Sequence, residues 1–424
     1  MAVSDILKVL YAPHKVFKKI VQNPGYLGPF LLLIIFVLGQ VGSSYVAGTR
    51  LYVEKTVPIG TSADAWTEDA TLWQANPGVV ISDNMVDFIN GSQAIQGFPD
   101  YYGNSSIEFA INDNNTVQMS LNNFGSQVNC GADGFTKIVF RVKILTPEAT
   151  PEKVTLTLYS LTDSNFFDYD LTSDFSSSTV NVWNNISAPV GSGNWASNGT
   201  PNWENITGIK LDFVWSDTSN IDLLLDGLFF RGSFVDQIGL VGGAFPFVAS
   251  IALNAFAPFL FEWLLLTGLI YVLLKGFKGN VVWRPLMVAV GCALVTLVIQ
   301  SIIGVVVNVA IFPEHLNYPL EVLAYVPGEF QAAQEALLNQ IATLTTVTYI
   351  IQVATWVWTI ALGTFIVRAV TGDKGIAEQA NMGKIAVNDA DAGEAAAFSW
   401  MKCLLVSGVS MFLTILIMGF LGVA

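Results

Sequence analysis

Charged residues are scarce in this sequence. They make up 12% of its 424 residues, whereas 52% are hydrophobic. Soluble domains usually carry about 25% charged residues, so the deficit indicates that lipid is part of the solvent of this chain. The simplest interpretation is therefore not a fully soluble globular fold.

The charge that is present is unevenly placed. Residues 51–235 contain 21 acidic and 7 basic residues, and the rest of the chain contains 12 of each, so this segment carries the whole formal charge of −14. Such acidity argues against nucleic acid as a partner. It suits a solvated domain outside the membrane, where acidic groups can meet cations.

Histidine and cysteine are also rare. The two histidines, His14 and His315, fall on opposite sides of the membrane in the topology derived below, which excludes a two-histidine zinc site. Cys292 and Cys403 lie in apolar runs, so Cys130 is alone in the polar segment and no disulfide framework can form there. Cys130 is expected to be a buried small side chain, with an intermolecular disulfide as the alternative.

Motifs of common catalytic sites are missing as well. The sequence has no Walker loop, Rossmann glycine pattern, nucleophile elbow or Cys/His metal spacing. The run from Gly372 to Gly375 is too short to cradle a phosphate and is typical of a turn. We therefore expect a protein that is not an enzyme.

Long apolar runs, in contrast, are abundant. A hydrocarbon core about 30 Å thick requires about 20 helical residues, and five runs are long enough. The expected transmembrane spans are 27–49, 250–274, 286–312, 339–367 and 401–422. Residues 236–424 thus form a membrane domain that holds spans two to five. Residues 238–253 are expected either to lie at the interface or to extend a helix kinked near Pro258.

The basic residues predict the orientation of these spans, because Lys and Arg stay on the cytoplasmic side. Basic residues occur before span one, between spans two and three, and between spans four and five. The loop between spans three and four contains Glu314, Glu321, Glu329 and Glu335 and no Lys or Arg. We expect a multi-pass protein of the cell membrane with its N-terminus in the cytoplasm and its C-terminus outside.

Asn-x-Ser/Thr sequons agree with this orientation, because N-glycosylation marks exterior segments. All six lie in the segment between spans one and two: Asn90, Asn104, Asn114, Asn185, Asn198 and Asn205. Residues 50–235 are therefore predicted to form an extracellular domain.

The same segment has the pattern of an all-β domain. Short apolar runs alternate with Gly, Asn, Asp and Ser turns, and Val154 to Tyr159 alternates polar and apolar residues. The expected strands are 107–111, 117–121, 137–144, 154–159, 180–186, 209–215 and 223–230. The predicted fold class is an α-helical transmembrane bundle of five spans, with a jelly-roll β-sandwich inserted between spans one and two.

Residues 1–26 form a cytoplasmic basic segment. Pro13 opens a predicted helix that ends before Asn23 and Pro24. One face holds four apolar residues and the other is basic: Val16, Phe17, Ile20 and Val21 oppose Lys15, Lys18 and Lys19. This helix suits the surface of the cytoplasmic leaflet, or it is a charged flank that sets the topology.

The membrane part resembles the Yip family of Rab/Ypt-interacting membrane proteins, especially its prokaryotic members. The basic helix has a Pro-x-x-x-Phe pattern from Pro13 to Phe17, and the run from Tyr26 to Phe30, Tyr-Leu-Gly-Pro-Phe, is similar to the Asp-Leu-Tyr-Gly-Pro-Phe-Trp element of eukaryotic members. The five-span layout is similar too. The resemblance covers about 1–50 and 237–424.

This sequence departs from the eukaryotic element at both ends, where Gly25 and Leu31 replace Asp and Trp. The resemblance therefore implies the family's architecture and a scaffolding or trafficking-like role rather than Rab binding.

The segment between spans one and two resembles the galactose-binding-like sandwiches of many carbohydrate-binding modules. The stretches 183–208 and 221–230 are like the last strands of that fold. The resemblance implies a structural calcium near the final strand, held by an Asp placed like Asp226. The further oxygen ligands considered are Asp222, Glu108 and Asp113.

Strand alternation puts Asp226 between Leu224 and Leu228 on an apolar face, so it should be partly buried and need a partner. A calcium ion is one such partner. Capping by backbone N–H groups, or a bulge that turns the carboxylate to solvent, are the alternatives.

Aromatic residues of the insert are candidates for stacking on sugar rings. The set is Tyr101, Tyr102, Trp183, Trp195 and Trp203. The competing interpretation is that they pack in the core or anchor loops.

Three polar residues fall at similar depths in the predicted spans. Counted from the cytoplasmic flanks at 1.5 Å per residue, Glu262 lies about 20 Å deep, and Gln300 and Gln352 each lie about 24 Å deep. A shared polar layer could form a pathway or ligand pocket, but we favour a hydrogen-bonded set that locks the spans together.

Together these features predict a non-catalytic membrane scaffold that displays a glycan-binding or protein-binding sandwich. Expected partners are the lipid bilayer, a surface glycan or glycoprotein and further membrane subunits. The alternative is a transporter or channel subunit that uses the layer around Glu262. Many sequons without disulfides fit an archaeal cell surface, with a eukaryotic lumen as the alternative.

Overall fold

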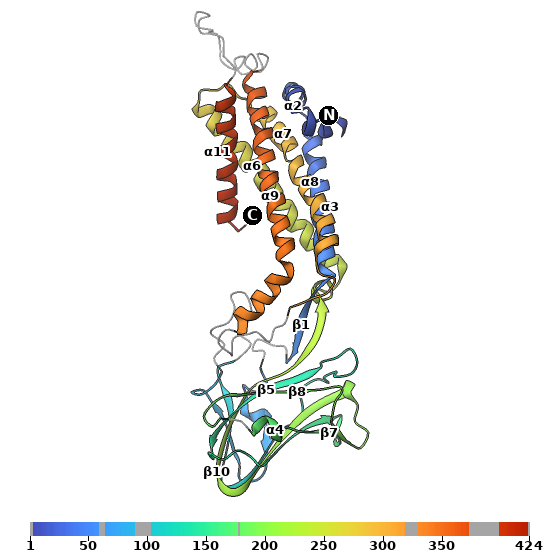
Figure 1. Cartoon of the computed structure of the whole chain (residues 1–424), viewed down its shortest axis with the longest axis vertical. Coiled ribbons are helices and arrows are strands. Elements are labelled where there is room, and N and C mark those ends of the chain that lie inside the picture. The colour runs from blue at the N-terminus through green and yellow to red at the C-terminus, as the bar shows by residue number, and fades with distance from the viewer. Residues whose placement is uncertain are drawn as a thin grey trace, which may run out of the picture. The chain divides into compact units, whose positions relative to one another are not determined.

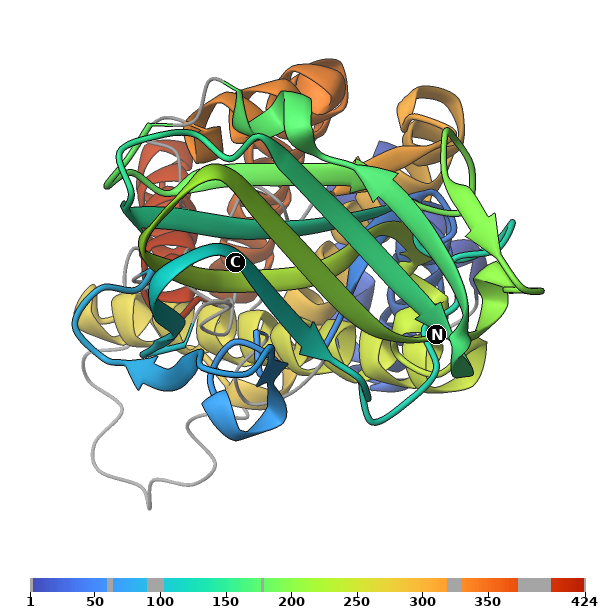
Figure 2. The same ribbon diagram turned by 90° about the horizontal axis from the view of Figure 1, so that it is seen from below.

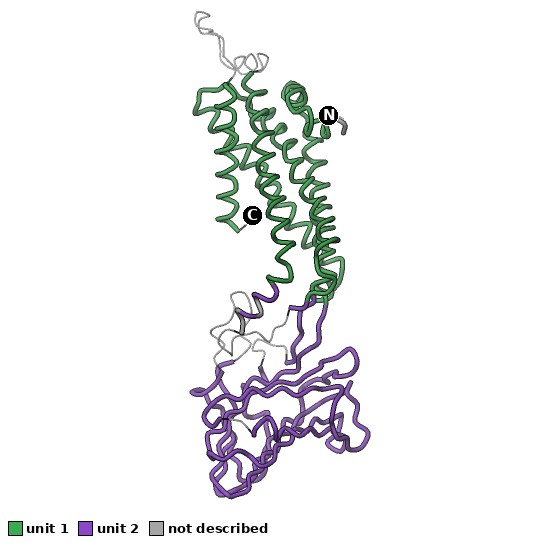
Figure 3. Tube along the Cα trace, in the orientation of Figure 1, with its two compact units in different colours: residues 1–51, 236–316, 338–424 green, residues 52–235, 317–337 purple. Residues whose placement is uncertain are grey.

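The protein divides into two compact units. A computed structural model describes residues 3–58, 64–89, 103–176, 179–318, 329–372 and 398–422. Unit 1 comprises 1–51, 236–316 and 338–424 and is helical, and unit 2 comprises 52–235 and 317–337 and holds the sandwich (Figure 3). Each unit has its own apolar core.

Five helices in the described part of the chain are long and apolar enough to cross a membrane, which confirms that expectation: Leu27–Gly48, Ala244–Gly276, Trp283–Ile311, Glu335–Gly372 and Trp400–Phe420. The helices of the chain run in the order α1 (Val3–Tyr11), α2 (Pro13–Gln22), α3 (Leu27–Gly48), α4 (Thr172–Phe175, in unit 2), α5 (Gln237–Leu240), α6 (Ala244–Gly276), α7 (Trp283–Ala293), α8 (Val295–Ile311), α9 (Glu329–Gly372) and α11 (Trp400–Phe420). Figure 1 shows the long helices of unit 1 running side by side.

The second span begins earlier than predicted. Helix α6 is continuous from Ala244 and holds Pro258 in its interior, so the residues from 244 onward extend the helix. The missing N–H of Pro258 removes one hydrogen bond of α6, which a long apolar helix can tolerate when its neighbours pack around it.

The third span is divided in two. A break at Leu294 separates α7 from α8.

Small residues let the helices of unit 1 approach closely, as is common in membrane proteins. A Cβ atom added to Gly291 of α7 would lie 2.6 Å from the ring of Trp263 on α6 and 2.8 Å from Pro29 on α3. The indole Nε1 of Trp263 donates a hydrogen bond to the Met287 carbonyl at 2.7 Å. At the far end of α3, Arg50 donates to the carbonyl oxygens of residues 308, 309 and 312 at the end of α8.

The amphipathic helix before span one forms as predicted, but its apolar face does not lie on lipid. Helix α2 begins at Pro13 and ends at Gln22. Its four apolar residues are buried in the core of unit 1, where α2 packs on α7. An apolar stripe satisfies the same hydrophobic requirement against protein as against lipid, and here protein occupies it.

The strands of the sandwich form one antiparallel sheet that folds over itself. They are β1 (Leu51–Val57), β2 (Gln74–Ala75), β3 (Val80–Asn84), β4 (Ser106–Leu121), β5 (Lys137–Thr146), β6 (Lys153–Ser160), β7 (Thr162–Asp170), β8 (Asn184–Pro189), β9 (Ala196–Asn198), β10 (Ile206–Asp236) and β11 (Leu316–Tyr318). Two short 3₁₀ turns, Ala70–Leu72 and Trp203–Asn205, connect them.

Two long bent strands, β4 and β10, pair along most of their length and belong to both layers. The first half of β10 pairs with β6, which continues to β7 and β9. The second half pairs with β5, which continues to β8. We call these layers sheet A and sheet B. Figure 2 shows the curved strands in a second view, and the predicted β-sandwich is confirmed.

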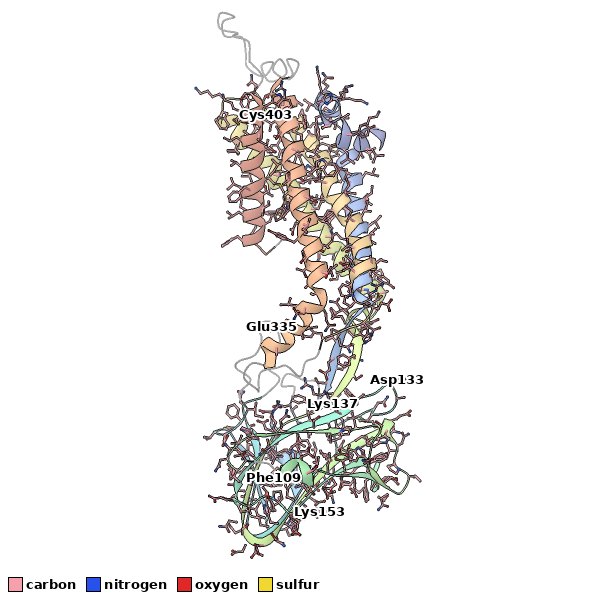
Figure 4. The ribbon with its side chains drawn as sticks, in the orientation of Figure 1. Phe109, Asp133, Lys137, Lys153, Glu335 and Cys403 are labelled. Carbon is pink, nitrogen blue, oxygen red and sulfur yellow. The ribbon has the colours of Figure 1, made fainter. Side chains whose placement is uncertain are left out.

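The space between the layers holds a continuous apolar core. Phe109, Phe213 and Phe230 are fully buried in it, and Figure 4 labels Phe109 within the sandwich. Cys130 is also fully buried, and burial raises the pKa of its thiol to about 12. It is the expected buried side chain, and its burial disfavours an intermolecular disulfide through it.

Candidate functional site

Three carboxylates converge beside the second half of β10. One oxygen from each of Asp64, Glu68 and Asp226 lies within 4.8 Å of the others. Asp226 is 1% exposed and Asp64 is 0% exposed. A bulge between Asp226 and Phe229, with Gly227 at φ 60°, lets the strand present this carboxylate to the segment that carries Asp64.

Backbone groups hold the carboxylates in place. The amides of Gly227 and Ile89 donate to Asp226 at 2.6 and 2.8 Å, and the amide of Gly103 donates to Asp64 Oδ2 at 3.1 Å. Predicted capping of Asp226 by backbone N–H groups therefore occurs. It leaves Asp64 Oδ1 buried and without a hydrogen-bond partner among the described residues.

The electrostatics of this cluster are unfavourable unless positive charge is added. Burial, followed by the charge of Glu68, raises the pKa of Asp64 to about 7. Burial, followed by the charge of Asp64, raises the pKa of Asp226 well above its usual value. Carboxylate oxygens are the ligands that calcium prefers, and the orphaned Asp64 Oδ1 is a free coordination position, so the residues fit this ion.

Of the four residues predicted as calcium ligands, the structure places Asp226 alone in the cluster with Asp64 and Glu68. Asp222 lies opposite Ala110 and Thr146, and Glu108 lies opposite Leu224 and accepts from Asn84 at 2.7 Å. Asp113 lies at the bend of β4, opposite none of these. Asp64 and Glu68 were missed because no spacing pattern connects them to Asp226. The signal available was the unusual density of acidic residues at 64–69 just ahead of the strands.

The aromatic residues predicted to bind sugar do not form one site. Tyr101 and Tyr102 lie outside the described residues. Trp203 stacks on Phe167 at 3.8 Å between ring centroids, and Trp195 meets Trp203 edge-on at 5.3 Å. Both tryptophans pack against the main core, which is the structural interpretation considered for them.

Trp183 lies elsewhere, on the outer face of sheet B. It packs with Ile89, Val139 and Phe229 in a small cluster separate from the main core, and it is half-buried. Ser187 pairs with Val139, and Val139 pairs with Phe229, so the three share one row across the sheet.

A pocket of about 370 Å³ begins at the same row. It is lined by Glu54, Thr136, Lys137, Ser187, Pro189, Gly232 and Phe234. Lys137, labelled in Figure 4, starts β5. Glu54 is buried, accepts from the amide of Gly232 at 2.8 Å and pairs with Arg231 at 3.8 Å. Fixed polar groups beside an aromatic ring can bind hydroxyl-rich ligands.

The sequons differ in exposure. Asn104, Asn185 and Asn198 are exposed, whereas Asn114 and Asn205 are half-buried. The side-chain oxygen of Asn114 also accepts from the amides of residues 115 and 116. Asn90 lies outside the described residues.

The intramembrane polar residues line a common cavity. Glu262, Gln300 and Gln352 surround a space of about 180 Å³ in unit 1, together with Gln40 of α3 and Thr414 of α11. The predicted hydrogen-bonded lock is wrong: within the described residues, none of the three bonds to another. Their side chains face one another across a gap that they do not fill.

Solved structures that are similar to part of this chain contain carbohydrate-binding β-sandwiches. A family 11 carbohydrate-binding module from Clostridium thermocellum, solved with a β-1,3-1,4-mixed-linked tetrasaccharide, is 13% identical, and the match covers 42% of this chain and 96% of that chain with a TM-score of 0.26. The CBM22-2 xylan-binding domain from Paenibacillus barcinonensis is 11% identical, with 39% and 94% covered and a TM-score of 0.23. A β-1,2-glucanase from Parabacteroides distasonis is 16% identical, with 40% and 24% covered and a TM-score of 0.27.

No protein-family model matches the chain, and no curated protein matches it. The resemblance of the helical unit to the Yip family therefore stays a prediction.

Proposed function

We propose that this protein is a non-catalytic, multi-pass membrane scaffold that displays its β-sandwich outside the cell as a glycan-binding module. The observation that carries the binding function is the outer face of sheet B. There a half-buried tryptophan belongs to a small cluster apart from the core, and Val139 of this cluster pairs with Ser187, which lines a polar pocket of about 370 Å³. The same surface could instead bind a glycoprotein or a further membrane subunit that presents similar groups.

The orientation is supported by the arrangement within unit 1. One end of unit 1 holds several helix ends (Figure 1). They are the beginnings of α2, α7 and α11 and the ends of α6 and α9. These are the segments that carry Lys and Arg beside the spans, including Lys275, Arg284, Arg368 and Lys402. Because Lys and Arg beside the spans stay in the cytoplasm, this basic end of unit 1 is expected to face the cytoplasm.

The glycan-binding proposal is tested with the full chain in lipid nanodiscs on an array of surface polysaccharides. Replacing Trp183 with Ala removes the aromatic face, so retained glycans should bind roughly tenfold more weakly. The matched control is Tyr159→Ala, because Tyr159 is half-buried in sheet A and far in register from the pocket row. The proposal would be contradicted if the wild-type protein bound no glycan on the array, or if the Trp183→Ala and Tyr159→Ala variants bound equally well.

Exterior placement predicts glycosylation of the exposed sequons. In a host that glycosylates exterior asparagines, Asn104, Asn185 and Asn198 should carry glycan at higher occupancy than Asn114, because an exposed side chain is accessible and that of Asn114 is tied to the backbone. Mass spectrometry of the purified chain measures the occupancies. A reporter protein of known exterior location is the control. If that reporter is glycosylated and none of the three exposed asparagines carries glycan, the proposed topology is contradicted.

The sandwich is also proposed to hold a structural calcium ion at Asp64, Glu68 and Asp226. The support is the convergence of three carboxylate oxygens and the buried Asp64 Oδ1 that no described residue satisfies. The ion would stabilise the domain and fix the segments before β4, rather than take part in a reaction. The transporter or channel alternative has one observation in its favour, the cavity around Glu262.

A further inference from the structure

Four long polar side chains line the cavity in unit 1 among mostly apolar residues. They are Gln40 of α3, Glu262 of α6, Gln300 of α8 and Gln352 of α9. Within the described residues these four side chains have no hydrogen-bond or ion-pair partner, and Gln300 Oε1 is fully buried. Unsatisfied polar groups at membrane depth are costly, and ionisable residues there are usually functional.

The charge of this lining is also unbalanced. Glu262 is its single carboxylate, and none of the described lining residues is Lys, Arg or His. Water can satisfy amide groups, and a cavity of about 180 Å³ has room for several molecules. Water cannot supply the positive charge that a carboxylate needs in surroundings of low dielectric.

We propose that this cavity binds a monovalent cation, with the Glu262 carboxylate as its charged ligand. The side-chain oxygens of Gln40, Gln300 and Gln352 would complete the coordination shell with water. Hard cations prefer oxygen ligands, and these come from four helices that surround the space. A divalent ion would leave a net positive charge in the membrane, whereas a monovalent ion makes the site neutral.

The choice between a cation and a proton follows from the amides. A proton on Glu262 would remove the charge and let the carboxyl group donate one hydrogen bond, which serves at most one of the three glutamine oxygens. A cation satisfies the carboxylate and the amide oxygens together. This inference does not depend on glycan binding, because the two sites lie in different units.

The test is the thermal unfolding of unit 1, followed by the helical circular dichroism of the full chain in nanodiscs. Sodium, potassium, lithium and N-methyl-D-glucamine chlorides are compared at constant ionic strength and constant calcium. At least one alkali cation should raise the melting temperature in a saturable way relative to N-methyl-D-glucamine. Glu262→Gln should lose this response while it stays folded, since an amide keeps the volume and removes the charge.

Two further variants separate a bound ion from a general salt effect. Gln300→Leu should raise the half-saturating cation concentration roughly tenfold, because one oxygen ligand is lost. Glu335→Gln removes the same charge from an exposed position on α9 and should respond like the wild type. Equal melting in all four salts, an unchanged response in Glu262→Gln, or stabilisation by acid alone would overturn the proposal.

Discussion

Calcium is expected to raise the melting temperature of the β-sandwich, and a chelator is expected to lower it. If the ion is present at about 100 times its dissociation constant, the stabilisation is about 2.7 kcal/mol. For a domain of this size that corresponds to a shift of about 5 to 10 °C. The physical reason is that three carboxylates share a site in which Asp64 and Asp226 are fully buried. The measurement is the β-sheet circular dichroism of the full chain during heating, with calcium or with chelator.

The pH dependence gives an independent check of the same site. The folded state raises the pKa of Asp64 from 3.8 to about 7, so between these values the folded protein binds more protons than the unfolded chain. Stability in chelator should therefore rise as the pH falls from about 7 towards 4, and it should be lost as the pH rises through 7. With calcium bound the carboxylates stay ionised, so the benefit of calcium should be largest at high pH.

Variants identify the ligands. Asp226→Asn keeps the volume of the side chain and removes one charge, so it should abolish the calcium response while remaining folded. Asp217→Asn is the matched control, because Asp217 lies exposed on the same strand β10. Equal melting of the wild type with calcium and with chelator would remove the metal and leave Asp226 as a carboxylate capped by backbone amides.

The architecture could be predicted where one physical requirement dominates. Crossing a hydrocarbon layer demands a long uncharged run, and the five such runs became five apolar helices. The bends of β4 and β10 were not predictable in the same way. The polar stretches 112–115 and 216–220 are typical of turns, yet they lie side by side where the paired strands bend, with Asn114 opposite Ser219. A local pattern cannot distinguish a reversal of the chain from a bend in a paired strand.

The candidate sites show the same division. Strand alternation placed Asp226 on a buried face, and helical rise placed Glu262, Gln300 and Gln352 at one depth. Gln40 was missed although the same rise, counted from the predicted start of span one at Leu27, puts it about 20 Å deep as well. The partners of Asp226 come from a segment distant in sequence.

Aromatic residues show why a residue type does not by itself identify a binding surface. Trp183 and Trp195 are close in sequence and equally suited to stack on sugar. Trp195 packs with Trp203 against the main core, whereas Trp183 lies on the other face of the sandwich. The layer to which each belongs depends on strand pairing over the whole domain.

Truncation of one core side chain is expected to lower the stability of one unit and leave the other unchanged. Phe230 is fully buried in the sandwich, with its ring centroid 5.6 Å from that of Phe124 and 6.1 Å from that of Trp66. Phe230→Ala should cost about 3 to 5 kcal/mol, which lowers the melting temperature of the β-sheet signal by roughly 6 to 20 °C. The helical signal should not move, because the cores of the two units share no residue.

The reciprocal variant is Trp263→Ala in unit 1. Trp263 is 1% exposed, contacts Phe30 edge-on at 6.0 Å and donates a hydrogen bond to the Met287 carbonyl. Its loss opens a cavity between three helices and should lower the transition of the helical signal alone. Both variants are measured in the full chain, so each serves as the control for the other. If both variants shifted a single shared transition, the sandwich would depend on the helices for its fold and could not act as a separately displayed domain.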